Sequence, residues 1–164
     1  HFFGLQEAKR DLVGIAIFDN LDKVLQNNEW LLETMWSRRE IENYFCTEEV
    51  LMAFARNDLP TDLFGLAEKS HRERVMRETI REVSVALATL GHPSPWDPKI
   101  KASDEFLDPL FKKFFAKLRL PLAFRKSDYH NLARLLPKSG IDSEVVEKLD
   151  LIVTTAKRAT PRVS

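Results

Sequence analysis

Cysteine and glycine are both scarce in this chain. Its 164 residues include one cysteine, Cys46, and five glycines. A single thiol excludes an internal disulfide framework and the paired-cysteine spacing of a zinc site. The sequence also lacks a Gly-x-x-x-x-Gly-Lys-Ser/Thr run, the backbone cradle with which P-loop proteins hold a nucleotide. We therefore expect no ATP hydrolysis by this chain alone, and we expect a reducing, cytoplasmic compartment.

Net charge and long apolar runs are absent as well. The 25 Lys and Arg residues balance the 25 Asp and Glu residues, so any binding of phosphate has to be local. No stretch is long enough to span a bilayer, and the first residues lack the apolar core of a signal peptide. These absences predict a chain without a membrane partner. Because the sequence begins at His1 instead of Met, we expect it to be part of a longer protein, and its oligomeric state stays open.

Two apolar segments near the start of the chain are typical of strands. Leu12–Phe18 is rich in β-branched residues and has no polar alternation, which predicts a strand covered on both faces of a parallel sheet. Trp30–Trp36 is the second candidate strand. The first segment ends at Asp19, with Asp22 soon after, and ligands of open α/β sheets bind at the carboxyl ends of strands. Two interpretations remain for this aspartate pair, a solvated turn and a cation site.

Apolar residues at helical spacing follow Cys46. Thr47 is predicted to cap a first helix. A long helix after Pro60 is predicted from a stripe formed by Met76, Ile80, Val83, Leu87 and Leu90. Its other face mixes arginine with glutamate, which favours a solvated, ion-paired surface over a nucleic-acid patch. Three more helices are expected: one with Phe106, Leu110, Phe111, Phe114, Phe115 and Leu118 in its core, one near 128–136, and one with Val145, Leu149, Ile152 and Ala156 in register.

These patterns predict an α/β chain with two parts and a tail. Residues 1–46 would form the α/β part, whose N-terminal portion we expect to be missing from this sequence. Residues 47–158 would form a helical region packed on it, and residues 159–164 a frayed tail.

Two segments resemble a known family. Phe18-Asp-Asn-Leu-Asp22, followed by Trp36-Ser-Arg-Arg-Glu-Ile-Glu-Asn-Tyr-Phe45, is similar to the C-terminal, topoisomerase-primase-like (TOPRIM) region of bacterial ATPases of the overcoming-lysogenization-defect type. The stretches 120–130 and 141–150 resemble the helical tail that follows this region. The resemblance implies a small, partly parallel TOPRIM-like sheet followed by a predominantly helical region, an upstream ATPase domain in the same protein, and nucleic acid as a partner of the full-length protein.

The same resemblance assigns the two aspartates of a metal site, and residues farther along the chain are candidates by their chemistry. In such domains an upstream glutamate and a pair of aspartates hold Mg²⁺ or Mn²⁺. Carried over to this chain, Asp19 is the first aspartate of the pair and Asp22 the nearest match to the second. Glu42 is a candidate third carboxylate, and its alternative role is a structural glutamate that caps a turn or pairs with an arginine. Arg38 and Arg39 are candidate phosphate contacts, with a solvated pair as the alternative.

The sequence departs from the family pattern in two ways. Two residues, instead of one, separate Asp19 from Asp22, and the upstream glutamate is missing. Two hypotheses follow. In the first, the chain is a TOPRIM-like, DNA-binding fragment of an ATPase-associated nuclease, a metal-dependent endonuclease in the full-length protein but inactive as this chain alone. In the second, it is a non-catalytic interaction or regulatory module with a degenerate metal site.

Overall fold

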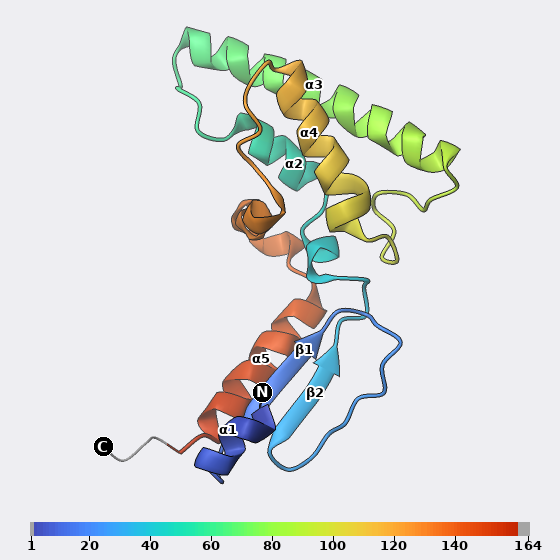
Figure 1. Cartoon of the computed structure of the whole chain (residues 1–164). Helices are drawn as coiled ribbons and strands as arrows, with labels where there is room; N and C mark the ends of the chain where they lie inside the picture. The colour runs from blue at the N-terminus through green and yellow to red at the C-terminus, as the bar shows by residue number, and fades with distance from the viewer. Residues whose placement is uncertain (1, 161–164) are drawn as a thin grey trace. The chain divides into compact units, whose positions relative to one another are not determined.

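The computed structural model of the chain describes residues 2–160, which divide into two compact units. Unit 1 combines the residues up to Ser37 with those from Ile141 onward, and unit 2 comprises Arg38–Gly140. Unit 1 holds the sheet, whereas unit 2, all of whose residues are described, is built of helices (Figure 1). The predicted fold class, α/β with a predominantly helical region, is therefore confirmed.

The sheet of unit 1 consists of two parallel strands. Strand β1 (Gly14–Phe18) pairs with β2 (Leu31–Met35), with Gly14 opposite Leu31 and Phe18 opposite Met35. Both strands lie where the sequence predicts them, and their pairing is parallel as expected. The burial differs, since every residue of β1 is half-buried instead of covered on both faces.

Two helices contact this sheet. Helix α5 (Ser143–Lys157) packs along β1, and helix α1 (Phe2–Ala8) lies beside the start of β1 (Figure 1). The ring of Phe2 approaches the Cα of Gly14 so closely that an added Cβ would lie 2.7 Å from a ring carbon. Glycine at this position thus permits the contact between α1 and the sheet.

Helix α5 faces the sheet with a different stripe from the predicted one. Leu149, Ile152 and Ala156 are exposed, whereas Thr155 is buried. Lys148 is half-buried, donates a 2.7 Å hydrogen bond from Nζ to Oγ1 of Thr34 on β2, and holds its ammonium 6.0 Å from the centroid of the Trp36 ring. The prediction of the buried face was wrong because a long amphipathic side chain, with its apolar stem, takes part in the packing.

The boundaries of the two units differ from the predicted parts. Residues 38–46 belong with the helices of unit 2, and α5 belongs with the sheet, although we predicted a single break at residue 46. The predicted frayed tail is tied down at its start, where the Thr160 hydroxyl donates a hydrogen bond to the Asp11 carboxylate. Residues 161–164 lie outside the described residues.

Unit 2 contains four α- or π-helices and three 3₁₀ segments. Thr47 caps α2 as predicted, since its Oγ1 accepts a hydrogen bond from the N–H of Val50 at 3.3 Å. The elements of unit 2 are η1 (Ile41–Tyr44), α2 (Glu48–Arg56), α3 (Leu63–Thr89), the π-helix η2 (Ala102–Leu107), α4 (Asp108–Lys117), η3 (Lys126–Leu135) and η4 (Lys138–Gly140).

The core of unit 2 lies between α2, α3, η2, α4 and η3. The predicted stripe of α3 is confirmed for four of its members, but Leu90 is 73% exposed because it lies just beyond the last residue of α3, Thr89. Gly91 follows with a φ of 76°, the left-handed conformation that commonly ends a helix. The stripe residues that are buried are Met76, Ile80, Val83 and Leu87, and they meet Phe106, Leu110, Phe111 and Phe114.

Ion pairs join α3 to α4 and give a testable titration. Lys113 Nζ lies 2.6 Å from one Glu82 carboxylate oxygen and Lys117 Nζ 2.8 Å from the other. These hydrogen bonds lower the pKa of Glu82 from its ordinary 4.5 to about 2. Because the folded-state pKa is depressed, the pairing stabilises the fold above pH 4.5 and is lost as the pH falls toward 2.

We expect the double variant Lys113→Met/Lys117→Met to raise the pKa of Glu82 toward its ordinary 4.5, measured by NMR titration of the side-chain carboxyl carbon. Lys112→Met is the matched control, because Lys112 pairs with Asp108. The same low pKa of Glu82 in the double variant would show that the two lysines do not cause the shift.

Candidate functional site

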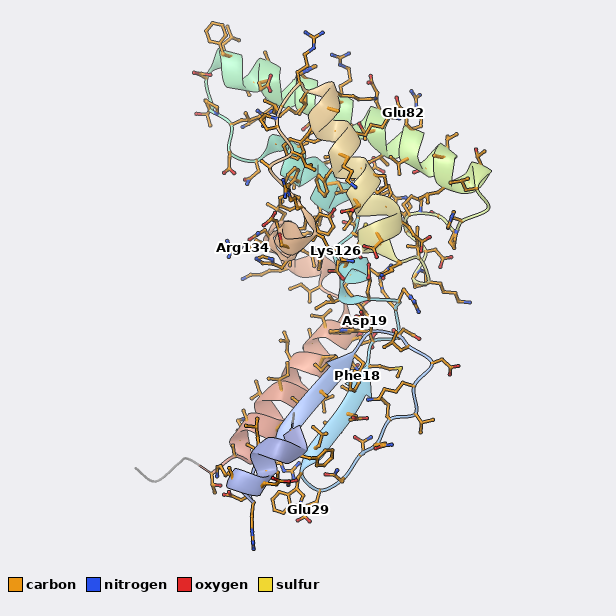
Figure 2. The ribbon with its side chains drawn as sticks, in the orientation of Figure 1. Phe18, Asp19, Glu29, Glu82, Lys126 and Arg134 are labelled. Atoms are coloured by element: carbon orange, nitrogen blue, oxygen red, sulfur yellow. The ribbon has the colours of Figure 1, made fainter. Side chains whose placement is uncertain are left out.

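Asp19 and Asp22 lie in the loop that leaves the carboxyl end of β1. Asp19 is the first residue after Phe18, the last residue of the strand, as Figure 2 shows. Both aspartates are exposed, and within residues 2–160 neither side chain forms a hydrogen bond or an ion pair. The structure therefore leaves two open carboxylates at the edge of a parallel sheet where ligands of α/β proteins bind.

One of the two residues between the aspartates, Asn20, has a structural role. Asn20 donates a 2.7 Å hydrogen bond from Nδ2 to the backbone carbonyl of Ser37, which follows β2. This contact joins the two chain segments that leave the ends of the two strands. Asn20 is half-buried, whereas Asp19 and Asp22 on either side stay in solvent. Asn20 thus anchors the loop between the two exposed aspartates.

Glu33 on β2 fixes the rest of this loop. Its carboxylate accepts a 2.8 Å hydrogen bond from the Gln26 N–H and lies 3.1 Å from Lys23 Nζ. Both contacts lower the pKa of Glu33. Lys23 also holds its ammonium 3.4 Å from the centroid of the Phe18 ring. The cation nearest to Asp22 in the sequence is therefore engaged by Glu33 and Phe18, and Asp22 keeps its charge unpaired.

Sequence reasoning missed a carboxylate in unit 1. Glu144, in the first turn of α5, accepts a 2.9 Å hydrogen bond from the Ser37 N–H and a second one from the Ser37 hydroxyl. Lys148 lies 3.7 Å from the same carboxylate. Glu144 thus binds the chain just after β2, and the spacing of four between Glu144 and Lys148 was the sequence signal for their pairing.

The Arg-Glu-Ile-Glu-Asn-Tyr segment builds the interior of unit 2. Glu40 is only 4% exposed, and its carboxylate accepts hydrogen bonds from Ser103 N–H at 2.5 Å and Ser103 Oγ–H at 3.1 Å. The N–H of Glu40 donates to Oδ1 of Asn43 at 3.0 Å, the reciprocal arrangement of a capping box. Asn43 also donates to the backbone carbonyl of Ile100 at 3.1 Å. These contacts bind the segment to the chain around residues 100–103, so its role within unit 2 is structural.

The two predicted phosphate contacts, Arg38 and Arg39, differ in their surroundings. The Arg38 guanidinium lies 4.7 Å from the centroid of the Tyr44 ring and donates a 2.9 Å hydrogen bond to the Asn43 carbonyl. The Arg39 side chain is exposed, and the backbone N–H of Arg39 donates a 2.7 Å hydrogen bond to the Pro98 carbonyl. Arg38 lines a pocket of about 340 Å³, whose other lining residues are Asn43, Cys46, Thr47, Glu48, Pro95 and Trp96.

The predicted site residues belong to different units. Asp19 and Asp22 lie in unit 1, whereas Arg38, Arg39 and Glu42 lie in unit 2. Within its unit, Glu42 is half-buried in η1, and its backbone carbonyl accepts a 2.8 Å hydrogen bond from the Cys46 N–H. Asp19 and Asp22 thus share one loop of unit 1, and Arg38 and Arg39 are sequence neighbours at the start of unit 2.

Cys46 is buried just before α2. Burial raises the pKa of its thiol, and the carboxylates of Glu40 and Glu42 raise it further. The neutral thiol is a poor nucleophile and a poor metal ligand. Cys46 therefore acts as a packing residue.

Asp19 and Asp22 are of the chemical type that a hard cation prefers. Mg²⁺ and Mn²⁺ prefer carboxylate oxygens, and Mg²⁺ commonly binds through one or two carboxylates while keeping several waters. Asp19 and Asp22 supply two such groups. Across residues 2–160, no group of three or more His, Cys, Asp or Glu side chains is placed to hold a metal ion. Asp19 and Asp22 therefore have no third ligand of these types beside them within residues 2–160.

Comparisons with protein-family models, with curated proteins and with solved structures find no match to this chain. Among the described residues, no helix has the length and apolar character needed to cross a bilayer.

Proposed function

We propose that the chain is the TOPRIM-like part of an ATPase-associated nuclease, in which Asp19 and Asp22 bind a divalent cation beside a nucleic-acid backbone. The observation that carries this proposal is the pair of exposed, unpaired carboxylates at the carboxyl end of β1. The resemblance of Phe18–Asp22 and Trp36–Phe45 to that family supports it.

The chain's own residues position this pair. Asn20 fastens the start of the loop to the Ser37 carbonyl, and Glu33 fastens its later part through Gln26 and Lys23. The loop backbone is thereby held while the two carboxylates face solvent. When bound there, Mg²⁺ or Mn²⁺ would supply Lewis-acid stabilisation of charge on a phosphodiester.

The test of this site is the effect of a cation on thermal unfolding. A cation that binds only the folded state stabilises it by about 2.7 kcal/mol at a hundredfold excess over its dissociation constant. With two protein ligands we expect weak affinity, so the rise in Tm should require millimolar Mn²⁺ or Mg²⁺. We expect Asp19→Asn to abolish the rise, as measured by scanning calorimetry.

Glu29→Gln is the matched control. Glu29 is an exposed acid of the same loop, at the opposite end of the strands from Asp19 in Figure 2, and its backbone carbonyl, not its carboxylate, accepts a 2.6 Å hydrogen bond from Arg158. Its variant loses the same charge and should keep the rise in Tm. An equal response of wild type and Asp19→Asn to Mn²⁺ would assign the aspartates to a solvated turn.

A specific observation favours a second candidate function, a non-catalytic interaction or regulatory module with a degenerate metal site. Residues 2–160 lack a three-carboxylate cluster, and the two aspartates are spaced more widely than in the family. In this case the fold would be kept for binding a protein partner. Absence of any rise in the Tm of the wild-type chain at millimolar Mn²⁺ or Mg²⁺ would support this module over the nuclease part.

The remaining elements of the proposal concern the full-length protein. An upstream ATPase domain would supply the nucleotide-binding loop that this sequence lacks, and DNA would be the substrate of a metal-dependent endonuclease in the cytoplasm. The family resemblance is the support for each of these elements.

A further inference from the structure

Three arginines line a surface hollow on α3. Arg74, Arg77 and Arg81 share it with Glu78, and its volume is about 480 Å³. Spacings of three and four residues place the arginines on one face of the helix, in a row of about 10 Å at 1.5 Å rise per residue. All three side chains are exposed. The row is a local concentration of positive charge on a chain whose net charge is zero.

The acids of α3 are neutralised by other cations. Glu68 pairs with Arg72 at 2.7 Å, and Glu73 lies 3.4 Å from Arg56 on α2. Farther along the helix, Glu78 lies 3.8 Å from Lys117 of α4.

Glu82, the fourth acid of α3, pairs with both Lys113 and Lys117, and its label in Figure 2 marks its place on the helix. Every glutamate of α3 thus has a cation outside the row. Arg77 reaches Glu73 only at 3.9 Å, Arg74 contacts His71, and Arg81 has no partner among the described residues. The positive charge of the row therefore exceeds what the acids beside it neutralise.

The guanidinium groups of the arginine row favour a phosphate-bearing ligand. The planar guanidinium donates paired hydrogen bonds to phosphate, which arginine does better than lysine. A membrane-surface helix would need apolar residues beside the cations, but the hollow is lined by Arg and Glu alone. A nucleic acid offers a continuous row of phosphates, with one negative charge per 1.7 Å or so of duplex axis.

We infer that the arginine row of α3 binds the phosphate backbone of a nucleic acid, without base specificity. This site lies in unit 2 and is separate from the carboxylates of Asp19 and Asp22, so the inference stands whether or not those aspartates bind a cation.

The test measures binding of fluorescein-labelled duplex oligonucleotides of two unrelated sequences by anisotropy, in EDTA so that no metal site contributes. Three phosphate contacts predict a slope of about −2.7 in log K against log salt, which is about a 40-fold loss of affinity between 50 and 200 mM salt. We expect the two sequences to bind equally. The triple variant Arg74→Gln/Arg77→Gln/Arg81→Gln should lose this binding, and Arg81→Gln alone should reduce the slope by about 1.

Arg72→Gln is the matched control, since Arg72 lies on the same helix but is paired with Glu68, and this variant should keep the wild-type slope. Circular dichroism checks that each variant is folded. No binding by the wild type at 50 mM salt, or an unchanged slope in the folded triple variant, would overturn the inference. So would binding to vesicles of phosphatidylserine and phosphatidylcholine without binding to either oligonucleotide, which would assign the row to a lipid surface.

Discussion

Phe111→Ala is expected to lower the free energy of unfolding by about 3–5 kcal/mol, the usual cost of removing a buried phenylalanine ring. Phe111 is 1% exposed on α4. Its ring centroid lies 5.0 Å from that of Phe54, 4.7 Å from that of Phe124 and 5.6 Å from that of Tyr129. The truncation therefore opens a cavity where three other rings meet, and they come from three separate segments that cannot all collapse into it. Denaturant unfolding followed by circular dichroism measures the loss.

The control for this truncation is Phe64→Ala. Phe64 lies near the start of α3 and is 84% exposed, so the same chemical change should alter the free energy of unfolding by no more than about 0.5 kcal/mol. If Phe111→Ala and Phe64→Ala cost the same, the packing of α4 against α2 and η3 would be wrong.

The second large effect is expected at Glu40. Glu40→Ala leaves both the N–H and the hydroxyl of the fully buried Ser103 without their acceptor, and each unsatisfied donor costs roughly 1–3 kcal/mol. We expect a loss of roughly 3 kcal/mol in the free energy of unfolding, measured by denaturant titration.

Two comparisons isolate the cause of this loss. Glu40→Gln keeps a side-chain oxygen as acceptor and should recover part of the stability. Glu49→Ala removes an exposed acid in the first turn of α2 and should cost well under half as much, about 1 kcal/mol at most. A Glu40→Ala variant as stable as wild type would mean that Glu40 does not carry the contacts with Ser103.

Local patterns in the sequence predicted the elements that depend on local chemistry. The run Leu12–Phe18 became β1, and Thr47 caps α2 through the hydrogen bond that its side chain was expected to accept. The face of α5 was mispredicted because its apolar residues surround much of the helix and fit more than one stripe. The face that α5 turns toward the sheet is set by contacts of Glu144 with Ser37 and of Lys148 with Thr34. These are tertiary contacts, and they leave no periodic pattern in the sequence.

In the candidate site, too, local features could be predicted from the sequence and tertiary contacts could not. The location of Asp19 at the end of a strand followed from the sequence, because the apolar run stops at that residue. The anchoring of Asn20 to Ser37 did not, since it depends on the parallel pairing of two strands. Glu40 and Glu42 are both glutamates and lie two positions apart, so the sequence could not tell which of them is buried. The hydrogen bonds from Ser103 identify Glu40 as the buried one.

The placement of unit 2 between β2 and α5 has a consequence for biosynthesis. A ribosome releases both strands early, but their covering helix α5 follows only after the whole of unit 2. At roughly 5–20 residues per second, the hundred or so residues of unit 2 take on the order of 5–20 s to appear. A bare two-stranded sheet is marginal in water, so the nascent chain carries β1 and β2 unfinished during that interval while unit 2 already has all its residues to fold. The order of synthesis thus favours folding of unit 2 before unit 1.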